Sequence, residues 1–461
     1  MSQFAPFDRR RMLATGLGLG LAGSALPAIA AAKTAVAPQS EPTRHGIAAS
    51  VFGIEGNAAA DQSQKLQAAI DQTAAKGIPL HLPPGRIVVG NIVLRPGTRI
   101  VGVAGATRLS YAGGGSLLTA PQSAGIRLSG LTLDGLALPL DRKRTRALLS
   151  LIDGLDVSLT DLVVERSSGN GIALERIGGQ VRDSSISGIA EAALFSVDAR
   201  GLEITSNRIS DCADNGILVW RSAVGADATL VSGNRIQRIA NTSGGSGQYG
   251  NGINVYRAGN VVISGNMIED CAYTAIRGNA ANNIQMVANS AHRSGEVALY
   301  AEFGFEGALI ASNVVDTAAT GIAVTNFNEG GRLAVVQGNI VRNLVRREYE
   351  PVDKRGEGIG IEADAVVANN VIEGAPTAGI LIGWGKYMRD VVATGNLIRK
   401  SRIGIAVTAD PAAGHCLLAN NMISGATDGA IRAMDHARPL AGDLALGKAP
   451  RNITLTGNIT S

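Results

Sequence analysis

The chain has 461 residues and a formal net charge of +4, with 42 Lys and Arg residues against 38 Asp and Glu. Nucleic-acid-binding proteins carry a clustered basic face, and we find no such cluster, so the composition argues against a nucleic-acid partner. Gly is abundant at 59 residues, while aromatic residues make up only 3%. Small aliphatic side chains stacked in layers, with glycines at the turns, would produce this balance.

Residues 1–30 are predicted to be a twin-arginine signal peptide. The arginines at 9–11 precede a stretch rich in Gly, Ala and Leu that ends in Ala28-Ile29-Ala30, a small-residue cleavage pattern. A membrane anchor is the alternative, because residues 12–32 are long enough to span a bilayer. Glycines and the Ala-x-Ala site favour cleavage after Ala30, and hence no permanent membrane anchor. We expect the export machinery and signal peptidase as partners and a periplasmic or secreted location.

Residues 31–46 are predicted to be a disordered linker, and residues 47–112 an N-terminal cap with the first strands. The cap contains an Ala- and Gln-rich amphipathic helix over 58–76, in which Leu66 and Ile70 lie one turn apart. Alternating strands are expected at 86–94 and 98–103. A stack of repeats needs such a cap to shield its first coil and its open strand edges.

Residues 113–461 are predicted to form repeated coils. Short aliphatic strands are followed by an Asn, a further aliphatic residue and then Gly-Ile, and most steps between successive Asn residues are 23 to 32 residues long. Such a period indicates stacked supersecondary units. Equal positions in successive coils lie about 4.8 Å apart, so amides that both donate and accept can bond in a column. The predicted structural ladder consists of Asn207, Asn234, Asn266, Asn289, Asn313, Asn339, Asn370, Asn396, Asn421 and Asn458.

These features resemble a known fold family. The helix with Leu66-Gln67-Ala68-Ala69-Ile70-Asp71 followed by Leu82-Pro83-Pro84-Gly85 resembles the N-terminal cap of pectin-lyase-like proteins, and the Asn and Gly-Ile coils resemble their repeats. With the export signal, the chain is similar to a family of twin-arginine-translocated β-helix repeat proteins. The resemblance implies an all-β fold, a right-handed single-stranded parallel β-helix of about 11–13 coils with a helix-containing cap. Its members include lyases, hydrolases, epimerases and non-catalytic proteins.

The three cysteines are predicted to be buried fillers. Cys212 and Cys271 both follow a ladder Asn by five residues and lie two coils apart. This separation is about 9–10 Å, which exceeds the reach of a disulfide. Cys416 lies on another limb. We expect no bond between them.

Two inserts interrupt the regular coils, at residues 238–251 and 345–357. They lengthen the segments from Asn234 to Gly252 and from Asn339 to Gly358 to 18 and 19 residues. Both should leave the same limb, three regular coils apart, and so form the walls of a lateral groove with a floor of about 14 Å. Long loops on a rigid scaffold commonly carry function.

An outward file of residues points to a sugar ligand. Four positions past the Gly of Gly-Ile, we expect Trp220, Tyr256 and Tyr300 in one column, with arginines beside them. Aromatic faces and arginines suit stacking and ion pairing with an acidic polysaccharide, such as a cell-envelope glycan. The predicted substrate-binding residues are Trp220, Arg221, Asn254, Tyr256, Arg257, Tyr273, Arg293 and Glu362.

Two kinds of chemistry are open in this groove. Proton abstraction beside a uronate needs a base, for which His292, Tyr300 or Arg277 are candidates, and a cation such as Arg257 or Arg293. Glycoside hydrolysis needs two carboxylates, for which Glu296 and Glu302 are the candidates. The motifs Asn-Thr-Asp, Asp-Asp, Gly-His-Gly and Asp-Pro-His-Asp of better-known catalytic members are absent from the sequence.

The alternative function is a non-catalytic structural or protein-binding envelope scaffold, because a solenoid offers a long flat surface. No cofactor and no metal site are implied by the sequence. Substrate identity and oligomeric state stay open.

Overall fold

The computed structural model describes residues 46–245, 247–347 and 356–461. The predicted signal peptide, all but the last residue of the predicted linker, and parts of both inserts (246 and 348–355) lie outside the described residues. Residues 43–461 form one compact unit. Within the described ranges, no helix is long and apolar enough to cross a membrane.

The N-terminal cap contains a short 3-10 helix, η1 (Ala49–Phe52), and one α-helix, α1 (Ser63–Ala75). The predicted helix is therefore present, but it starts five residues later than predicted. Leu66 and Ile70 are fully buried, as their one-turn spacing predicts. The helix starts after Asp61, whose carboxylate accepts the Ser63 N–H at 2.7 Å, and a left-handed Gly77 (φ +66°) follows its end.

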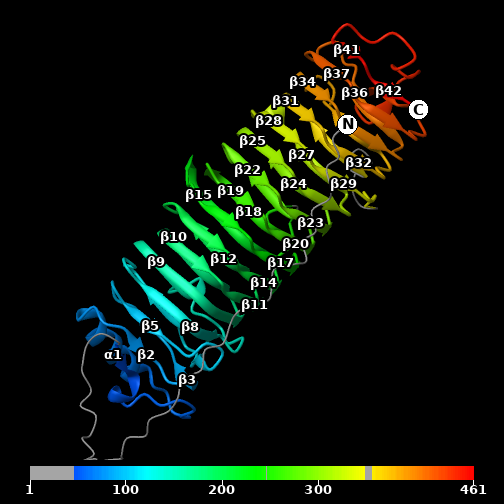
Figure 1. The fold of residues 1–461 in the computed structure, drawn as a ribbon. Helices are drawn as coiled ribbons and strands as arrows, with labels where there is room; N and C mark the ends of the chain where they lie inside the picture. The colour runs from blue at the N-terminus through cyan, green and yellow to red at the C-terminus, as the bar shows by residue number, and fades with distance from the viewer. Residues whose placement is uncertain (1–45, 246, 348–355) are drawn as a thin grey trace, which may run out of the picture. The chain divides into compact units, whose positions relative to one another are not determined.

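The strands stack into parallel sheets that together make about 14 turns of a β-solenoid, slightly more than the 11–13 coils expected (Figure 1). Each turn contributes a strand to three sheets, here called sheets 1, 2 and 3. Sheet 1 contains β4 (Ile92–Val93), β7 (Leu118–Ala120), β9 (Ala147–Ser167), β10 (Asn170–Arg182), β12 (Ala192–Val197), β15 (Asn215–Ala226), β18 (Asn251–Gly259), β21 (Ile276–Asn279), β24 (Val297–Glu302), β27 (Thr320–Val324), β30 (Glu357–Ile361), β33 (Ala378–Ile382), β36 (Ile403–Thr408) and β39 (Ile431–Asp435), with β40 (Arg438–Pro439) antiparallel to β39.

Sheet 2 follows sheet 1 around each turn. The long strands β9 and β10 bend around the corner and belong to both sheets. Sheet 2 also contains β1 (Ile47–Ala48), β2 (Leu80–His81), β5 (Arg99–Val101), β8 (Arg127–Asp134), β13 (Leu202–Thr205), β16 (Leu230–Ser232), β19 (Val262–Ser264), β22 (Ile284–Val287), β25 (Glu306–Ala311), β28 (Arg332–Gln337), β31 (Ala363–Ala368), β34 (Arg389–Thr394), β37 (Cys416–Ala419) and β41 (Ile453–Thr456).

Sheet 3 precedes the corner that leads back to sheet 1. Parts of β8 and β9 pair in it as well. Its other strands are β3 (Gly85–Val89), β6 (Thr107–Tyr111), β11 (Ser185–Ile189), β14 (Arg208–Cys212), β17 (Arg235–Ile239), β20 (Met267–Cys271), β23 (Ser290–Ser294), β26 (Val314–Asp316), β29 (Ile340–Arg342), β32 (Val371–Glu373), β35 (Leu397–Arg399), β38 (Met422–Ser424) and β42 (Ile459–Thr460).

Close backbone packing explains the repeated Gly-Ile. The isoleucines stack inward in register, for example Ile322 opposite Ile359 and Ile359 opposite Ile380, and all three are fully buried. A Cβ atom placed on Gly358 would lie 2.2 Å from the carbonyl oxygen of Gly379 in the next coil. Glycine at 358 therefore avoids a clash with the next coil, whereas Ala275 and Ala298 hold the same position in two earlier coils.

The ladder asparagines are bonded from coil to coil. Each amide nitrogen donates to the side-chain oxygen of the next Asn, at 3.0 Å from Asn266 to Asn289 and 3.1 Å from Asn289 to Asn313. The same oxygen accepts the backbone N–H of the preceding Asn, at 3.0 Å for Asn266. The column runs from Asn207 to Asn458, and all but its last member are buried. Polar groups that would otherwise be unpaired in the core thus satisfy one another.

The three cysteines are buried and free of disulfides, as the two-coil separation predicts. Burial raises the pKa of the thiols of Cys212 and Cys416 to about 12, and the pKa of Cys271 rises as well. A thiol with such a pKa is protonated at neutral pH and is a poor nucleophile.

Candidate functional site

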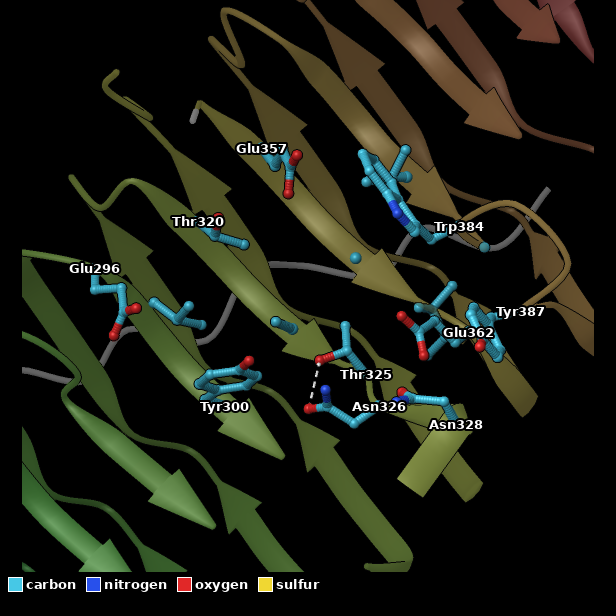
Figure 2. A pocket seen from close by; sticks show the side chains of 16 residues that line it. Glu296, Tyr300, Thr320, Thr325, Asn326, Asn328, Glu357, Glu362, Trp384 and Tyr387 are labelled. Atoms are coloured by element: carbon cyan, nitrogen blue, oxygen red, sulfur yellow. Dashed lines mark hydrogen bonds between the residues drawn. The ribbon is translucent and has the colours of Figure 1, made fainter. Parts of the chain in front are cut away.

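A cavity of about 350 Å³ opens on the outward face of sheet 1, across the four successive strands β24, β27, β30 and β33 (Figure 2). One register column forms its floor: Tyr300, Ala323, Gly360 and Leu381. The two small residues between the two large ones leave the hollow. A Cβ placed on Gly360 would meet no heavy atom within 4 Å, so this glycine faces open space.

The segments that follow these strands form one wall of the cavity. Asn326 and Asn328 lie around the short 3-10 helix η2 (Phe327–Glu329), which follows β27. Trp384 and Tyr387 follow β33, and their backbone groups bond to each other at 3.2 and 3.0 Å. This small antiparallel bridge fixes both aromatic side chains at the cavity (Figure 2).

Three carboxylates line the cavity. Glu296 and Glu357 lie at the start of β24 and β30, and Glu362 directly follows β30. Burial raises the pKa of Glu362, although its Oε2 accepts the backbone N–H of Phe327 at 2.6 Å, which works in the opposite direction. The described residues that line the cavity include no Lys or Arg. Its carboxylates accept hydrogen bonds from hydroxyls, and the amides of Asn326 and Asn328 can both accept and donate them.

Tyr300 is a proton donor in this setting. Its side chain is largely buried, and this burial, with a smaller contribution from Glu302, raises its pKa above the ordinary value for a phenol. The hydroxyl therefore keeps its proton at neutral pH. This is unfavourable for the predicted role of Tyr300 as a resting base.

Arg277 and Glu302 are engaged with each other below the surface. The Nε atom of Arg277 lies 2.5 Å from Oε1 of Glu302, and the amide of Asn279 donates to the same oxygen at 2.9 Å. Only 11% and 2% of the two charged side chains are exposed. The guanidinium also lies 5.5 Å from the centroid of the Tyr300 ring. A buried pair of this kind holds Tyr300 in place and leaves neither group accessible as base or second carboxylate.

His292 and Arg293, which the sequence analysis placed in the groove, do not line the cavity. Both lie on β23 in sheet 3, and the corner at Gly295 turns the chain between them and β24. His292 Nε2 lies 2.9 Å from Ser290 Oγ. Arg293 pairs with Asp270 at 2.6 Å and Glu269 at 2.8 Å on the surface. These residues are near Tyr300 in sequence, but they face another side of the coil.

The predicted single file of Trp220, Tyr256 and Tyr300 is wrong at its third member. Tyr256 pairs with Asn279, which pairs with Glu302, whereas Tyr300 lies opposite Arg277 in the neighbouring column. The coil that contains Tyr300 lacks Gly-Ile. Leu299 takes the place of the isoleucine there. The residue equivalent to Tyr256 in this coil is therefore Glu302, two positions after Tyr300.

The remaining predicted binding residues lie outside the cavity. Trp220 packs edge-to-face between Phe195 and Tyr256, with centroids 5.3 and 5.7 Å apart, and Arg257 lies 4.8 Å from the Tyr256 ring. Arg221 lies 4.0 Å from the buried Asp227. These residues form an aromatic row on sheet 1, several strands before the cavity.

The first insert lies against the floor instead of standing as a wall. The Tyr273 hydroxyl donates to the carbonyl of Gly245 at 3.1 Å, and the side-chain amide of Asn254 donates to the backbone carbonyl of Gln248 at 3.5 Å. Arg347, in the second insert, lies 5.4 Å from the Tyr273 ring. The cavity therefore extends to both sides of the coil that contains the second insert: β24 and β27 precede this insert in the chain, and β30 and β33 follow it.

Of the predicted site residues, the structure brings Glu296, Tyr300 and Glu362 together at the cavity. Sequence analysis missed seven other polar or aromatic residues that line it. They are Thr320, Thr325, Asn326, Asn328, Glu357, Trp384 and Tyr387. Across the described ranges, no group of three or more His, Cys, Asp or Glu side chains is arranged to hold a metal ion.

Comparison with known proteins concerns the fold. None of the curated protein sequences matches the chain. The N-terminal fragment of gene product 12 of bacteriophage phi29 matches with a TM-score of 0.51 and 14% identity, over 90% of this chain and 72% of that one. A tailspike protein of Escherichia coli bacteriophage HK620 matches with a TM-score of 0.50 and 12% identity, over 90% and 78%.

The A-module of mannuronan C-5 epimerase AlgE4 from Azotobacter vinelandii is less similar, with a TM-score of 0.43 and 16% identity over 89% of this chain and 100% of that one. Residues 215–403 match the family model described as "Right handed beta helix region". With the parallel strand pairing of all three sheets, this match identifies the protein as a right-handed parallel β-helix.

Proposed function

We propose that the protein binds a polysaccharide, with one sugar unit seated in the cavity over β24, β27, β30 and β33. The observation that carries the proposal is the convergence of two aromatic rings, Trp384 and Tyr387, with amide and carboxylate side chains around an open floor. A sugar ring has apolar C–H faces that stack on aromatic rings and hydroxyls that bond to carboxylates and amides. A concave site with a few convergent polar groups is the usual form of a binding site.

The lining favours a neutral sugar unit in this cavity over the acidic one expected from the sequence. A uronate carboxylate would need a nearby cation, and the described lining offers carboxylates instead. Arg277, the nearest predicted cation, is already paired with Glu302. Hydroxyl groups, in contrast, can donate to Glu362 and to the amides of Asn326 and Asn328.

Glycoside hydrolysis at the same cavity is the second candidate function. The observation that favours it is the burial of Glu362, which raises its pKa and so extends its protonated form toward neutral pH. A protonated carboxyl beside a glycosidic oxygen can act as a general acid. Incubation with neutral polysaccharides, followed by measurement of new reducing ends, tests this reaction. Binding without cleavage would leave the non-catalytic role.

We also propose that the protein acts after export, in the periplasm or outside the cell. The support is the arginine run at 9–11 followed by Ala28-Ile29-Ala30. Replacing Arg9 and Arg10 by Lys should leave the full-length chain in the cytoplasmic fraction. If the replaced protein still reaches the periplasm, this part of the proposal falls.

Trp384→Ala is expected to weaken glycan binding about fivefold, because stacking of an aromatic ring contributes on the order of 1 kcal/mol. The measurement is a titration with neutral polysaccharides such as dextran, xylan and glucomannan. Phe52→Ala is the control, since Phe52 is a half-buried aromatic residue of η1 in the N-terminal cap and does not line the cavity. Equal losses in both variants, or none in either, would contradict the assignment of the cavity.

The pH dependence of the protein's stability should reveal the raised pKa of Glu362. Its pKa is raised in the folded protein, so its contribution to stability is present below the unfolded value of about 4.3 and is lost as pH rises through the folded value. Glu362→Gln removes this loss while keeping an acceptor for the Phe327 N–H. The melting temperature of the variant relative to the wild type should therefore increase as pH rises.

The exposed Glu203 on β13 offers the control for this experiment. Glu203→Gln should leave the pH profile of the melting temperature parallel to that of the wild type. A Glu362→Gln profile that also stays parallel would show that this carboxyl titrates normally. It would remove the argument for a general acid.

A further inference from the structure

A second hollow, of about 250 Å³, lies on the outward face of sheet 1 over β9, β10 and β12. Its floor again contains small residues in one register column, Ser150 and Ala173, followed by the large Phe195. The loop of residues 142–146, Arg-Lys-Arg-Thr-Arg, lines the hollow. Sequence analysis found no basic cluster, and the structure corrects this locally, because four cations converge on one depression.

The backbone of this loop is held in a defined turn by Asp141. Its carbonyl oxygen accepts the N–H groups of Arg144 and Thr145 at 2.9 and 3.0 Å, and its carboxylate accepts that of Lys143 at 3.0 Å. Arg142 anchors the loop to the next coils through Glu191, at 2.5 and 3.2 Å. The remaining cations therefore project from a fixed support, which limits the entropy lost on binding.

The hollow has positive charge in excess. Arg142, Lys143, Arg144 and Arg146 are all exposed. Arg142 is paired, and Arg144 lies 3.4 Å from Asp141. In the part of the chain that the structure describes, no carboxylate lies within salt-bridge distance of Lys143 or Arg146, and Glu175, the only acidic residue lining the hollow, is paired with Arg176.

We propose that this hollow binds anionic substituents, carboxylate or sulfate, of the same glycan chain whose neutral units occupy the cavity; the statement about a shared chain rests on the proposed function. Both depressions lie on sheet 1 in one register column. Ala173 and Ala323 are six strand steps apart, or about 29 Å. The aromatic row starts at Phe195 in the hollow itself, and its other members, Trp220 and Tyr256, lie between the two depressions.

A polysaccharide fits this surface better than a nucleic acid does. Among the described residues of this hollow, Lys143 and Arg146 lack a carboxylate within salt-bridge distance, and along the aromatic row Arg257 stacks on Tyr256 while Arg221 lies 4.0 Å from Asp227. Nucleic-acid binding depends on many phosphate contacts along an extended basic face. A linear glycan with spaced anionic groups requires only one cationic site and a stacking surface.

The test compares Lys143→Gln combined with Arg146→Gln against Arg208→Gln combined with Arg235→Gln. The control pair removes the same charge from two exposed neighbouring arginines on sheet 3. Each full-length variant is titrated with polygalacturonate, dextran sulfate, uncharged dextran and duplex DNA at low and high NaCl. We expect the first pair alone to bind polygalacturonate or dextran sulfate about tenfold more weakly, with the wild-type affinity falling at high salt.

The outcomes separate this inference from the proposed function. Equal affinity of both variants for the two anionic polymers, or DNA binding as tight as theirs, would overturn the anionic-glycan site. If neutral glycans still bind and Trp384→Ala still weakens them, the cavity stands without the second site. Loss of anionic binding in the first pair but not in Trp384→Ala would show that the two depressions take separate chains.

Discussion

Asn313→Leu is expected to lower the free energy of unfolding by about 3 kcal/mol or more. Asn313 Oδ1 accepts the Asn289 N–H at 2.9 Å, and its Nδ2 donates to the Met286 carbonyl at 2.8 Å and to Asn339 at 3.0 Å. Leucine has a similar volume and no polar atom, so these buried groups lose their partners, at about 1–3 kcal/mol each. Urea unfolding followed by circular dichroism measures the change.

The end of the ladder provides the control. Asn458 accepts from Asn421 at 3.0 and 2.9 Å, but it is partly exposed, and no further Asn follows it. Water can replace some of its bonds, so Asn458→Leu should cost about 1 kcal/mol. Equal losses at both positions would show that packing, and not the continuous column of amides, sets the stability of Asn313.

Gly360→Leu should reduce glycan affinity about 100-fold while leaving the fold intact. Gly360 forms the open floor of the cavity, and a Cβ atom there would meet no heavy atom within 4 Å. Its backbone does not adopt the left-handed conformation that demands glycine. Leucine would occupy the space of the bound sugar, which corresponds to about 2.7 kcal/mol. Titration with the neutral glycan that the wild type binds measures the loss.

Gly358→Ala tests the opposite situation two residues earlier on the same strand. Its Cβ would lie 2.2 Å from the Gly379 carbonyl oxygen, so the melting temperature should fall by several degrees, as overpacking costs about 1–3 kcal/mol. Gly360→Leu should instead melt within a few degrees of the wild type. Undiminished glycan binding by a stable Gly360→Leu protein would remove the cavity from the proposed function.

The fold could be predicted because its two repeated signals have separate physical causes. Asn satisfies buried backbone groups at one corner, and Gly-Ile allows close backbone contact at another. The number of turns was underestimated because the first coils lack the Asn signal: Leu131 and Leu162 lie in coils that stack without it. Hydrophobic packing alone holds these turns.

The site was only partly predictable, because a depression depends on small residues in neighbouring coils. Ala323 and Gly360 attract no attention in a sequence, and their register becomes visible only when the strands are paired. Trp384 and Tyr387 follow the second insert in a coil of ordinary length. One signal could have found Trp384: it is one of only two tryptophans in the chain. The role predicted for His292 rested on its closeness to Tyr300 in the sequence, but a sharp corner of the coil separates the two residues.

The bonds between the ladder amides have a direction, because each amide nitrogen donates to the side-chain oxygen of the Asn in the next coil. All inner rungs are chemically interchangeable, so excising one entire turn, such as residues 267–289, would present each remaining amide with the same neighbour it had before. Evolution can therefore shorten or extend such a molecule without redesigning its middle.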